Sequence, residues 1–480
     1  RKSAPTFFYD LQRLIELTQR SVKPSDHNLQ LIWKCDWKHF LTLPLAKKLI
    51  LNIANDEFVD VVLMNSIELF SIAISSLQLF VQQNFTGPHD DFIDFILDDI
   101  DSSNDLRSEL QVNGINLNVN VENPALLLLS IRIMKSLVRA SPTSYVLRWW
   151  YLRVLYIYGE VLDELSESLY SEFRLYSEEL LKRSDNFAST ELKALLVLEI
   201  TQQFLSYKGV YKAEEHLKIV QNLLNTKLEV KGEIGGRIKF QQKALPQLSL
   251  KVEGNFQNIP PNDVTHSTTT LPKLLRHDDD VRQDRVQFQS EEANTVAEIP
   301  SLIQLLVLAK VITTLLMNIH LEDSHKRTVD RSLRQCEDLS NMIKSNNVPL
   351  FHRLSLVYAS FTRPRWFVQI QLGDLMLSLG VVKSALERYL KIQKWEDAIV
   401  CYTILDPRHK AAEIIRQEIE KKPTVELYCL LGDAADDPMY YELAWKMSNE
   451  NSARVQKDWG KYDRLYHDVT RIECTNATRR

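Results

Sequence analysis

The chain has 480 residues and a formal net charge of −5, with 58 lysines and arginines against 63 aspartates and glutamates. This balance gives no overall positive field that would attract nucleic acid or an anionic membrane. Its 12 glycines are 2.5% of the residues (12/480), against an average of about 7%, and such a shortage disfavours hairpin-rich sheets and glycine-rich phosphate loops. The chain is therefore predicted to be mostly helical.

Residues 1–226 are predicted to form a helical N-terminal region. Its strongest helix covers 145–164, and two more follow at 191–207 and 213–224. The apolar stretches 61–81 and 301–321 carry Glu68 and Lys310 near their centres, where a charge in a bilayer costs about 2.5–3.5 kcal/mol. Both stretches are predicted to be buried core helices.

Residues 227–299 interrupt this pattern. Four glycines and four prolines fall between 228 and 280, and apolar residues alternate before and after Gly235-Gly236. This pattern predicts a β-hairpin with its turn at the two glycines, a further strand at 248–252, and a flexible polar loop over 254–298. Residues 300–363 are predicted to continue the helical region, with two helices over 300–343 and one over 350–362.

Short helices recur over 364–457, where the sequence Leu-Gly-Asp occurs at 372–374 and again at 431–433. Helical hairpins are predicted at 366–391, 394–420 and 424–449. The spacing follows the tetratricopeptide (TPR) consensus, in which small residues bring two helices close and aromatic residues fill the space beside them. The second repeat has Ser448 where the later aromatic is expected, so it is predicted to be degenerate. The residues assigned to repeat packing are Leu372, Gly373, Ala385, Tyr389, Trp395, Ala398, Tyr402, Tyr428, Leu431, Gly432 and Ala444. An ordinary helical bundle with two chance matches is the alternative interpretation.

The residues also carry a specific resemblance. WEDAIVCY (395–402), IIRQEIEKK (414–422), LYCLLGD (427–433) and SARVQ (452–456) together resemble the start of the repeat region in the tetratricopeptide repeat protein 27 family. The resemblance is strong over 364–456 and diffuse upstream. It implies an intracellular α-solenoid of the cytoplasm, and also of the nucleus, that binds proteins and helps to assemble complexes alongside chaperones. It implies no catalytic chemistry and no cofactor. The family continues into regular repeats, whereas residues 458–480 are predicted to be an irregular, divergent tail that leaves the last hairpin uncapped, as in a truncated or alternative product.

Local motifs for phosphate binding, zinc proteolysis and serine hydrolysis are absent from the sequence. The acidic segment 89–109 could suggest calcium, but Asn104 stands where the calcium loop needs glycine, so an amphipathic helix is preferred. His320 and His325 fit no metal-ligand spacing. No catalytic, cofactor or metal residue is predicted.

Three functions therefore compete. The leading hypothesis is a non-enzymatic, all-α, TPR-type scaffold for protein partners of unknown identity, without a membrane or nucleic-acid role. An RNA-binding solenoid would use Trp149, Trp150 and Tyr151, which are interleaved with arginines, and a basic edge at 326–334. Core packing of the three rings is the preferred interpretation. An enzyme subunit on a helical scaffold is the third hypothesis, and no sequence feature favours it.

Overall fold

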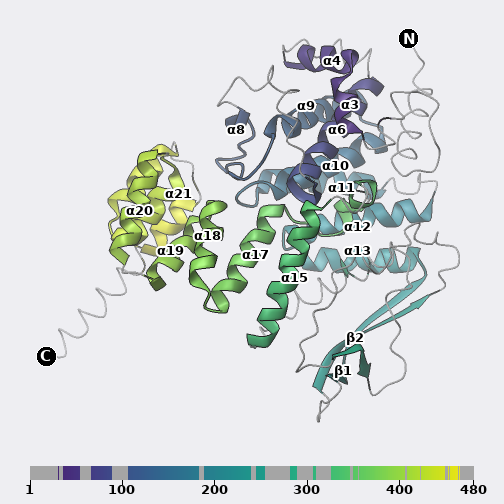
Figure 1. Ribbon diagram of the computed structural model, residues 1–480. Helices are drawn as coiled ribbons and strands as arrows, with labels where there is room; N and C mark the ends of the chain where they lie inside the picture. The colour runs from purple at the N-terminus through teal and green to yellow at the C-terminus, as the bar shows by residue number, and fades with distance from the viewer. Residues whose placement is uncertain are drawn as a thin grey trace.

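The chain folds as an all-α, TPR-like solenoid with one small antiparallel sheet, seen in a computed structural model (Figure 1). A stack of N-terminal helices leads through α15 (Lys326–Lys344) and α17 (Arg365–Ser378) to a row of shorter helices. The structure describes residues 31, 36–54, 66–88, 106–182, 189–238, 245–254, 282–288, 306, 308–309, 326–345, 350–354, 356–405, 408–421, 423–448, 452, 454–462 and 464.

The N-terminal stack is built from helices that pack on one another, with α6 against α9, α9 against α10, and α12 against α13. Serine hydroxyls cap two of these helices, since Ser144 and Ser189 accept hydrogen bonds from the backbone N–H three residues on. The elements are α3 (Trp37–Thr42), α4 (Pro44–Ala54), α6 (Ser66–Val81), the π-helical turn η1 (Gln82–Thr86), α8 (Leu106–Glu109), α9 (Pro124–Ala140), α10 (Tyr145–Glu160), α11 (Glu167–Lys182), α12 (Thr190–Ser206) and α13 (Val210–Leu223).

Helix α6 covers most of the first apolar stretch and is buried from Leu69 to Val81. Its place inside the stack agrees with the core helix expected there. No helix in the described part of the chain is long and apolar enough to cross a bilayer. Most of the second stretch, 301–321, lies outside the described residues.

The aromatic residues of α10 form the centre of the N-terminal core. Trp149 and Trp150 are each 2% exposed, and the guanidinium of Arg153 lies 4.8 Å and 4.4 Å from their ring centroids. Arg153 also pairs with Glu199 of α12 at 2.7 Å, and the same carboxylate accepts the indole N–H of Trp149 at 2.7 Å. The rings are packed inside the protein and present no face on which RNA bases could stack.

The sheet corrects the predicted hairpin. Strand β1 (Thr226–Ile238) runs straight through Gly235-Gly236 and pairs antiparallel with β2 (Leu245–Gly254) and β3 (Arg282–Phe288), in the order β2-β1-β3. Gly235 lies opposite both Leu245 and Phe288, so a turn at this position is wrong. The register of β1 with β3 shifts between Gly236 and Ile238, and glycine is typical of such irregular strand positions. Strand β3 lies within the stretch predicted to be a loop.

Helix α15 (Lys326–Lys344) connects the stack to the repeats. The single helix predicted over 350–362 is wrong, because α16 (Leu350–Leu354) is followed by a separate 3₁₀ turn, η5 (Val357–Ala359), and Phe361 adopts a positive φ of 53°. Arg353 of α16 donates to the carbonyl of Thr86 at 2.8 Å and to that of Met342 at 3.2 Å. This one side chain therefore holds the end of α15 against η1.

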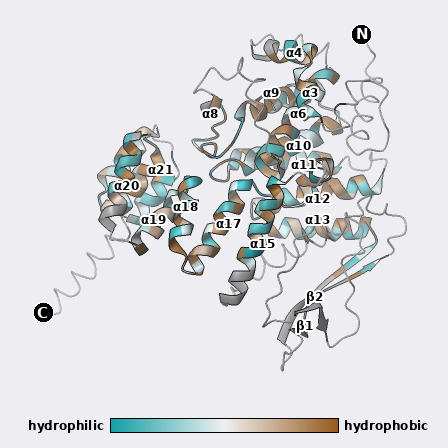
Figure 2. Ribbon diagram, in the orientation of Figure 1, coloured by the Kyte–Doolittle hydropathy of each residue, from teal (hydrophilic) through white to brown (hydrophobic). Residues whose placement is uncertain are grey.

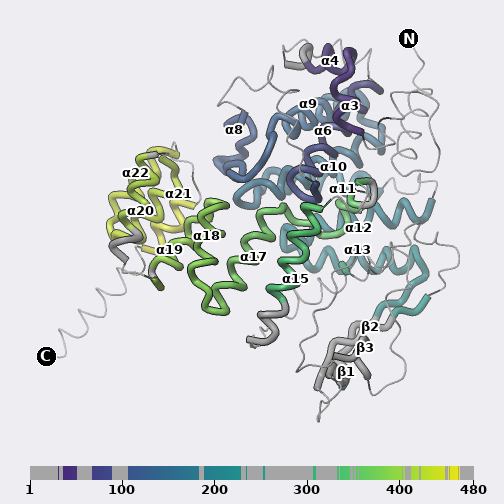
Figure 3. Tube along the Cα trace, in the orientation of Figure 1, coloured from purple at the N-terminus to yellow at the C-terminus, as the bar shows by residue number. Residues whose placement is uncertain are grey.

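Three helical hairpins follow, and each lies within a few residues of a predicted one. In Figure 3 they lie side by side, away from the sheet, and each helix packs on the next. Figure 2 shows hydrophobic and hydrophilic residues interleaved along them, as expected for helices with one buried face. The pairs are α17 (Arg365–Ser378) with α18 (Val382–Lys391), α19 (Trp395–Leu405) with α20 (Arg408–Lys421), and α21 (Val425–Ala435) with α22 (Met439–Met447).

The last hairpin is covered, contrary to expectation. Residues 454–462 are helical, and Val455 of this end helix is fully buried with Tyr441 and Ala444. Trp459 and Tyr462 pack against the same cluster. The predicted irregular tail is therefore wrong for its first residues, because apolar side chains spaced three to four apart give 454–462 a packing face.

The Arg153–Glu199 pair gives a first test. Glu199→Ala leaves Arg153 and the Trp149 N–H buried without their acceptor, and we expect a loss of about 3–5 kcal/mol in the free energy of unfolding. Urea denaturation followed by circular dichroism measures it. The control is Glu109→Ala, which breaks a solvated pair with Arg132 and should cost at most about 1 kcal/mol. Equal losses in the two variants would contradict the central role of the buried pair.

Candidate protein-interaction site

The first Leu-Gly-Asp sequence forms a close contact between two helices. Gly373 of α17 faces the ring of Tyr389 in α18, and a Cβ placed on this glycine would lie 2.6 Å from Tyr389 Cε1. The Tyr389 hydroxyl donates to Asp374 Oδ1 at 2.7 Å. Glycine leaves room for the ring, and the next residue fixes its hydroxyl. We call this arrangement a Gly-Asp-Tyr contact.

A second Gly-Asp-Tyr contact joins α21 and α22. A Cβ on Gly432 would lie 2.8 Å from Tyr441 Cζ, and the Tyr441 hydroxyl donates to Asp433 Oδ1 at 2.5 Å. Burial raises the pKa of Tyr441 and of Tyr389 well above the usual range, and the acceptor carboxylates raise both further. Both hydroxyls therefore stay protonated and remain donors.

The sequence alignment missed Tyr441 because it placed the second aromatic at Ser448. In both repeats a tyrosine lies near a small residue on the second helix of the hairpin. Tyr389 follows Ala385 by four residues, whereas Tyr441 precedes Ala444 by three. Both spacings place the ring one helical turn from the small residue, on the same face. The Asp that follows Gly in each repeat was a usable signal for a tyrosine partner.

The other residues assigned to repeat packing fall into two groups. Leu372, Ala385, Ala398, Leu431 and Ala444 are buried, while Trp395, Tyr402 and Tyr428 are half-buried. Trp395 packs against the cluster that contains Ala412 and Ile415, and Tyr428 packs against the cluster around Tyr441.

Arg454 connects the end helix to two earlier helices. Its guanidinium pairs with Glu396 of α19, with Glu426 of α21 at 3.4 Å and with Asp458 at 3.8 Å. Burial alone would raise the pKa of Glu396, but Arg454 and Lys394 outweigh it and lower that pKa. Burial does raise the pKa of Glu426, against the attraction of Arg454. The arginine therefore stabilises carboxylates on separate repeats.

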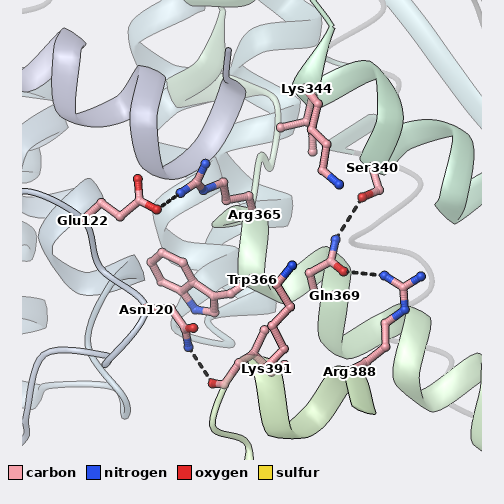
Figure 4. Close-up of a pocket in the computed structure, with 11 residues that line it drawn as sticks. Asn120, Glu122, Ser340, Lys344, Arg365, Trp366, Gln369, Arg388 and Lys391 are labelled. Carbon is pink, nitrogen blue, oxygen red and sulfur yellow. Dashed lines mark hydrogen bonds and ion pairs between the residues drawn. The ribbon is translucent and has the colours of Figure 1, made fainter. Parts of the chain in front are cut away.

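A cavity of about 390 Å³ lies where the first hairpin meets the N-terminal stack (Figure 4). We call it the junction cavity. It is formed by the loop 120–122, the last turns of α15, the start of α17 and the end of α18. Its lining residues are Asn120, Glu122, Ser340, Ile343, Lys344, Arg365, Trp366, Gln369, Arg388, Lys391 and Ile392.

Polar contacts hold the walls of the junction cavity together. Asn120 donates to the carbonyl of Ile392 at 2.8 Å, and Arg365 pairs with Glu122. On the other side, Gln369 accepts from Arg388 at 2.8 Å and donates to Ser340 at 2.9 Å, as the dashed lines in Figure 4 show. Residues from four separate segments are thus fixed around one space, which no sequence pattern indicated.

The acidic, histidine-containing and basic segments of the sequence lie partly outside the described residues. Those outside are most of the acidic segment 89–109, the two histidines His320 and His325, and the side chains at 326–331 of the basic edge. Within the described part, no group of three or more His, Cys, Asp or Glu side chains is placed to hold a metal ion.

The chain is similar in sequence to several known TPR proteins. The chain is 21% identical to the tetratricopeptide repeat protein 27 homolog of Dictyostelium discoideum, over 83% of the chain and 54% of that protein. It is 22% identical to a TPR repeat-containing protein of Schizosaccharomyces pombe, over 92% of the chain and 63% of that protein. A tetratricopeptide repeat-containing protein of Caenorhabditis elegans is 24% identical over 70% of the chain and 50% of its own length.

These relatives confirm the resemblance to the tetratricopeptide repeat protein 27 family. The chain spans about half to two thirds of the length of these three curated relatives. No family model matches it, and no solved structure matches it.

The Gly-Asp-Tyr contact predicts the effect of a single methyl group. Gly373→Ala forces a Cβ into the Tyr389 ring, and we expect a net loss of about 1–2 kcal/mol although alanine favours helix. Gly460→Ala is the matched control, because nothing lies within 4 Å of its Cβ position and helix propensity alone should stabilise it by about 0.5–1 kcal/mol. Thermal unfolding of both variants checks the signs. Adding Tyr389→Leu to Gly373→Ala should cost less than the sum of the two single changes; an additive cost would disprove the contact.

The Arg454 cluster predicts a pH dependence. The lowered pKa of Glu396 means that its ionised form stabilises the fold above its ordinary pKa of 4.5, and that this stabilisation disappears as the pH falls through the folded-state value. Glu396→Gln should therefore lower the melting temperature slightly at pH 7, and wild type and variant should converge as the pH falls below the folded-state pKa of Glu396. Thermal scans from pH 3 to 7 measure this, with the exposed Glu387→Gln on α18 as control. A difference that grows at low pH would contradict the assignment.

Proposed function

We propose that the protein is a non-catalytic scaffold that binds protein partners through its helical repeats and helps to assemble a larger complex, alongside chaperones, in the cytoplasm and the nucleus. The observation that carries the proposal is the repeated Gly-Asp-Tyr contact, at Gly373 and again at Gly432. Each of the two contacts fixes the relative positions of the two helices within its own hairpin. A stack of fixed hairpins offers an extended, rigid surface, which repeat proteins use to bind peptides and domains.

The relatives support this function through their names, since three of them are named for TPR repeats. The sequence also lacks the local motifs of phosphate binding, zinc proteolysis and serine hydrolysis. The RNA-binding alternative loses its main support, because Trp149 and Trp150 are buried around Arg153. A protein-binding scaffold is therefore the preferred function.

Recovery of partners tests the proposal. The tagged full chain is purified from cells, and the proteins recovered with it are quantified by mass spectrometry. We expect a reproducible set that is lost when Gly373→Leu and Gly432→Leu are combined, because each leucine pushes a buried tyrosine out of its contact. Gly460→Ala should recover the same set as the wild type. Failure to recover any reproducible partner, or full recovery by the double leucine variant, would count against a repeat-based scaffold. A fluorescent fusion of the same chain tests the compartments.

A further inference from the structure

We propose that the junction cavity binds an acidic segment of a protein partner, whose Asp or Glu carboxylates are held by Lys344, Arg388 and Lys391. The inference rests on the proposed function as a protein-binding scaffold and names the chemistry of one contact. The cavity lies between the first hairpin and the N-terminal stack. Its charge, its size and its fixed walls carry the proposal.

The charges that line the junction cavity are strongly unequal. Four cationic side chains face one acidic side chain, Glu122, which already pairs with Arg365. Arg388 donates to the neutral amide oxygen of Gln369, and that contact leaves its charge uncompensated. Lys344 and Lys391 are exposed, and neither forms an ion pair with another described residue. Three positive charges are therefore available to an anionic group.

The excess of positive charge is confined to the junction cavity, and this limits the kind of anion that can bind there. The whole chain carries a net charge of −5, so it has no overall positive field that would attract a long polyanion such as RNA. A short acidic segment would feel chiefly the three cations, because charges farther away than about 8 Å are largely screened at physiological salt. Charge therefore favours a few carboxylates over a phosphate backbone.

The size and the apolar lining of the cavity point the same way. A volume of about 390 Å³ accommodates a few side chains. Trp366, 8% exposed, lines the cavity together with Ile343 and Ile392. Because so little of the Trp366 ring is open, it can contact an aliphatic side chain but offers no face for a stacked base. The segment that fits best has carboxylates on both sides of one apolar residue.

The helices that carry the cations are also held in place before any partner arrives. The bond from Asn120 to the Ile392 carbonyl fixes the end of α18, next to Lys391. Gln369 links Arg388 of α18 to Ser340 of α15. A site whose walls are already ordered loses less conformational entropy on binding, so a short segment can bind measurably.

Peptide binding to the full chain tests the proposal. The probe is a fluorescein-labelled peptide, Glu-Asp-Leu-Glu-Asp, titrated by fluorescence anisotropy at 50 mM salt. We expect Lys344→Glu with Lys391→Glu to weaken binding at least tenfold. The control combines Lys383→Glu with Lys218→Glu, which changes the charge equally at exposed lysines outside the cavity and should alter the affinity less than twofold. A Gln-Asn-Leu-Gln-Asn peptide should not bind, and added salt should weaken the acidic peptide.

Four results would overturn the proposal: no binding of the acidic peptide to the wild type, equal loss in the two double variants, equal binding of the neutral peptide, or displacement of the acidic peptide from the cavity by a uridine oligonucleotide. All four lysines are exposed, so we expect both double variants to stay folded, and circular dichroism checks this. Partner recovery separates the two proposals. If the partner set persists while the peptide does not bind, the acidic-segment inference fails and the scaffold function stands. If no partner is recovered, the scaffold function itself fails.

Discussion

The repeat region depends on how closely two helices can approach. At Gly373 and at Gly432 a tyrosine ring from the second helix of the hairpin occupies the space that any side chain on the first helix would need. The following aspartate accepts a hydrogen bond from the tyrosine hydroxyl, so the orientation of the ring is fixed as well as its distance from the glycine. The interhelical distance, and with it the geometry of the hairpins, follows from the absence of one methyl group.

The sequence predicted what depends on neighbouring residues. Helices α10, α12 and α13 and the three hairpins were placed within a few residues, because apolar periodicity and turn residues are local signals. The wrong or missing predictions involve contacts between residues that lie far apart in the sequence. The role of Gly235-Gly236 is set by a third strand, β3, and the place of Tyr441 is set by which face of α22 meets Gly432. The junction cavity could not be predicted at all, since the contact of Asn120 with Ile392 joins positions 272 residues apart.

Polar side chains help to define how the two regions meet, beside the apolar core that both regions share. Arg353 binds the carbonyl of Thr86, and Arg365 pairs with Glu122, so each arginine joins a helix near the repeats to a loop or turn of the N-terminal stack. Arg363 likewise pairs with Glu160 at 2.6 Å. Directional contacts of this kind fix orientation where apolar packing alone would allow sliding. The stack therefore serves as a base on which the first hairpin is set at a defined angle.

Arg454 has a consequence for how the repeats that it joins come apart. Repeat arrays usually touch only their nearest neighbours, so they can fray from an end one unit at a time. Arg454 reaches past α22, α21 and α20 to Glu396 of α19, 58 residues earlier in the chain. When the end helix detaches, Glu396 and the partly buried Glu426 lose their shared cation together. These helices are thus linked beyond their immediate neighbours, which makes their opening more cooperative than stepwise fraying.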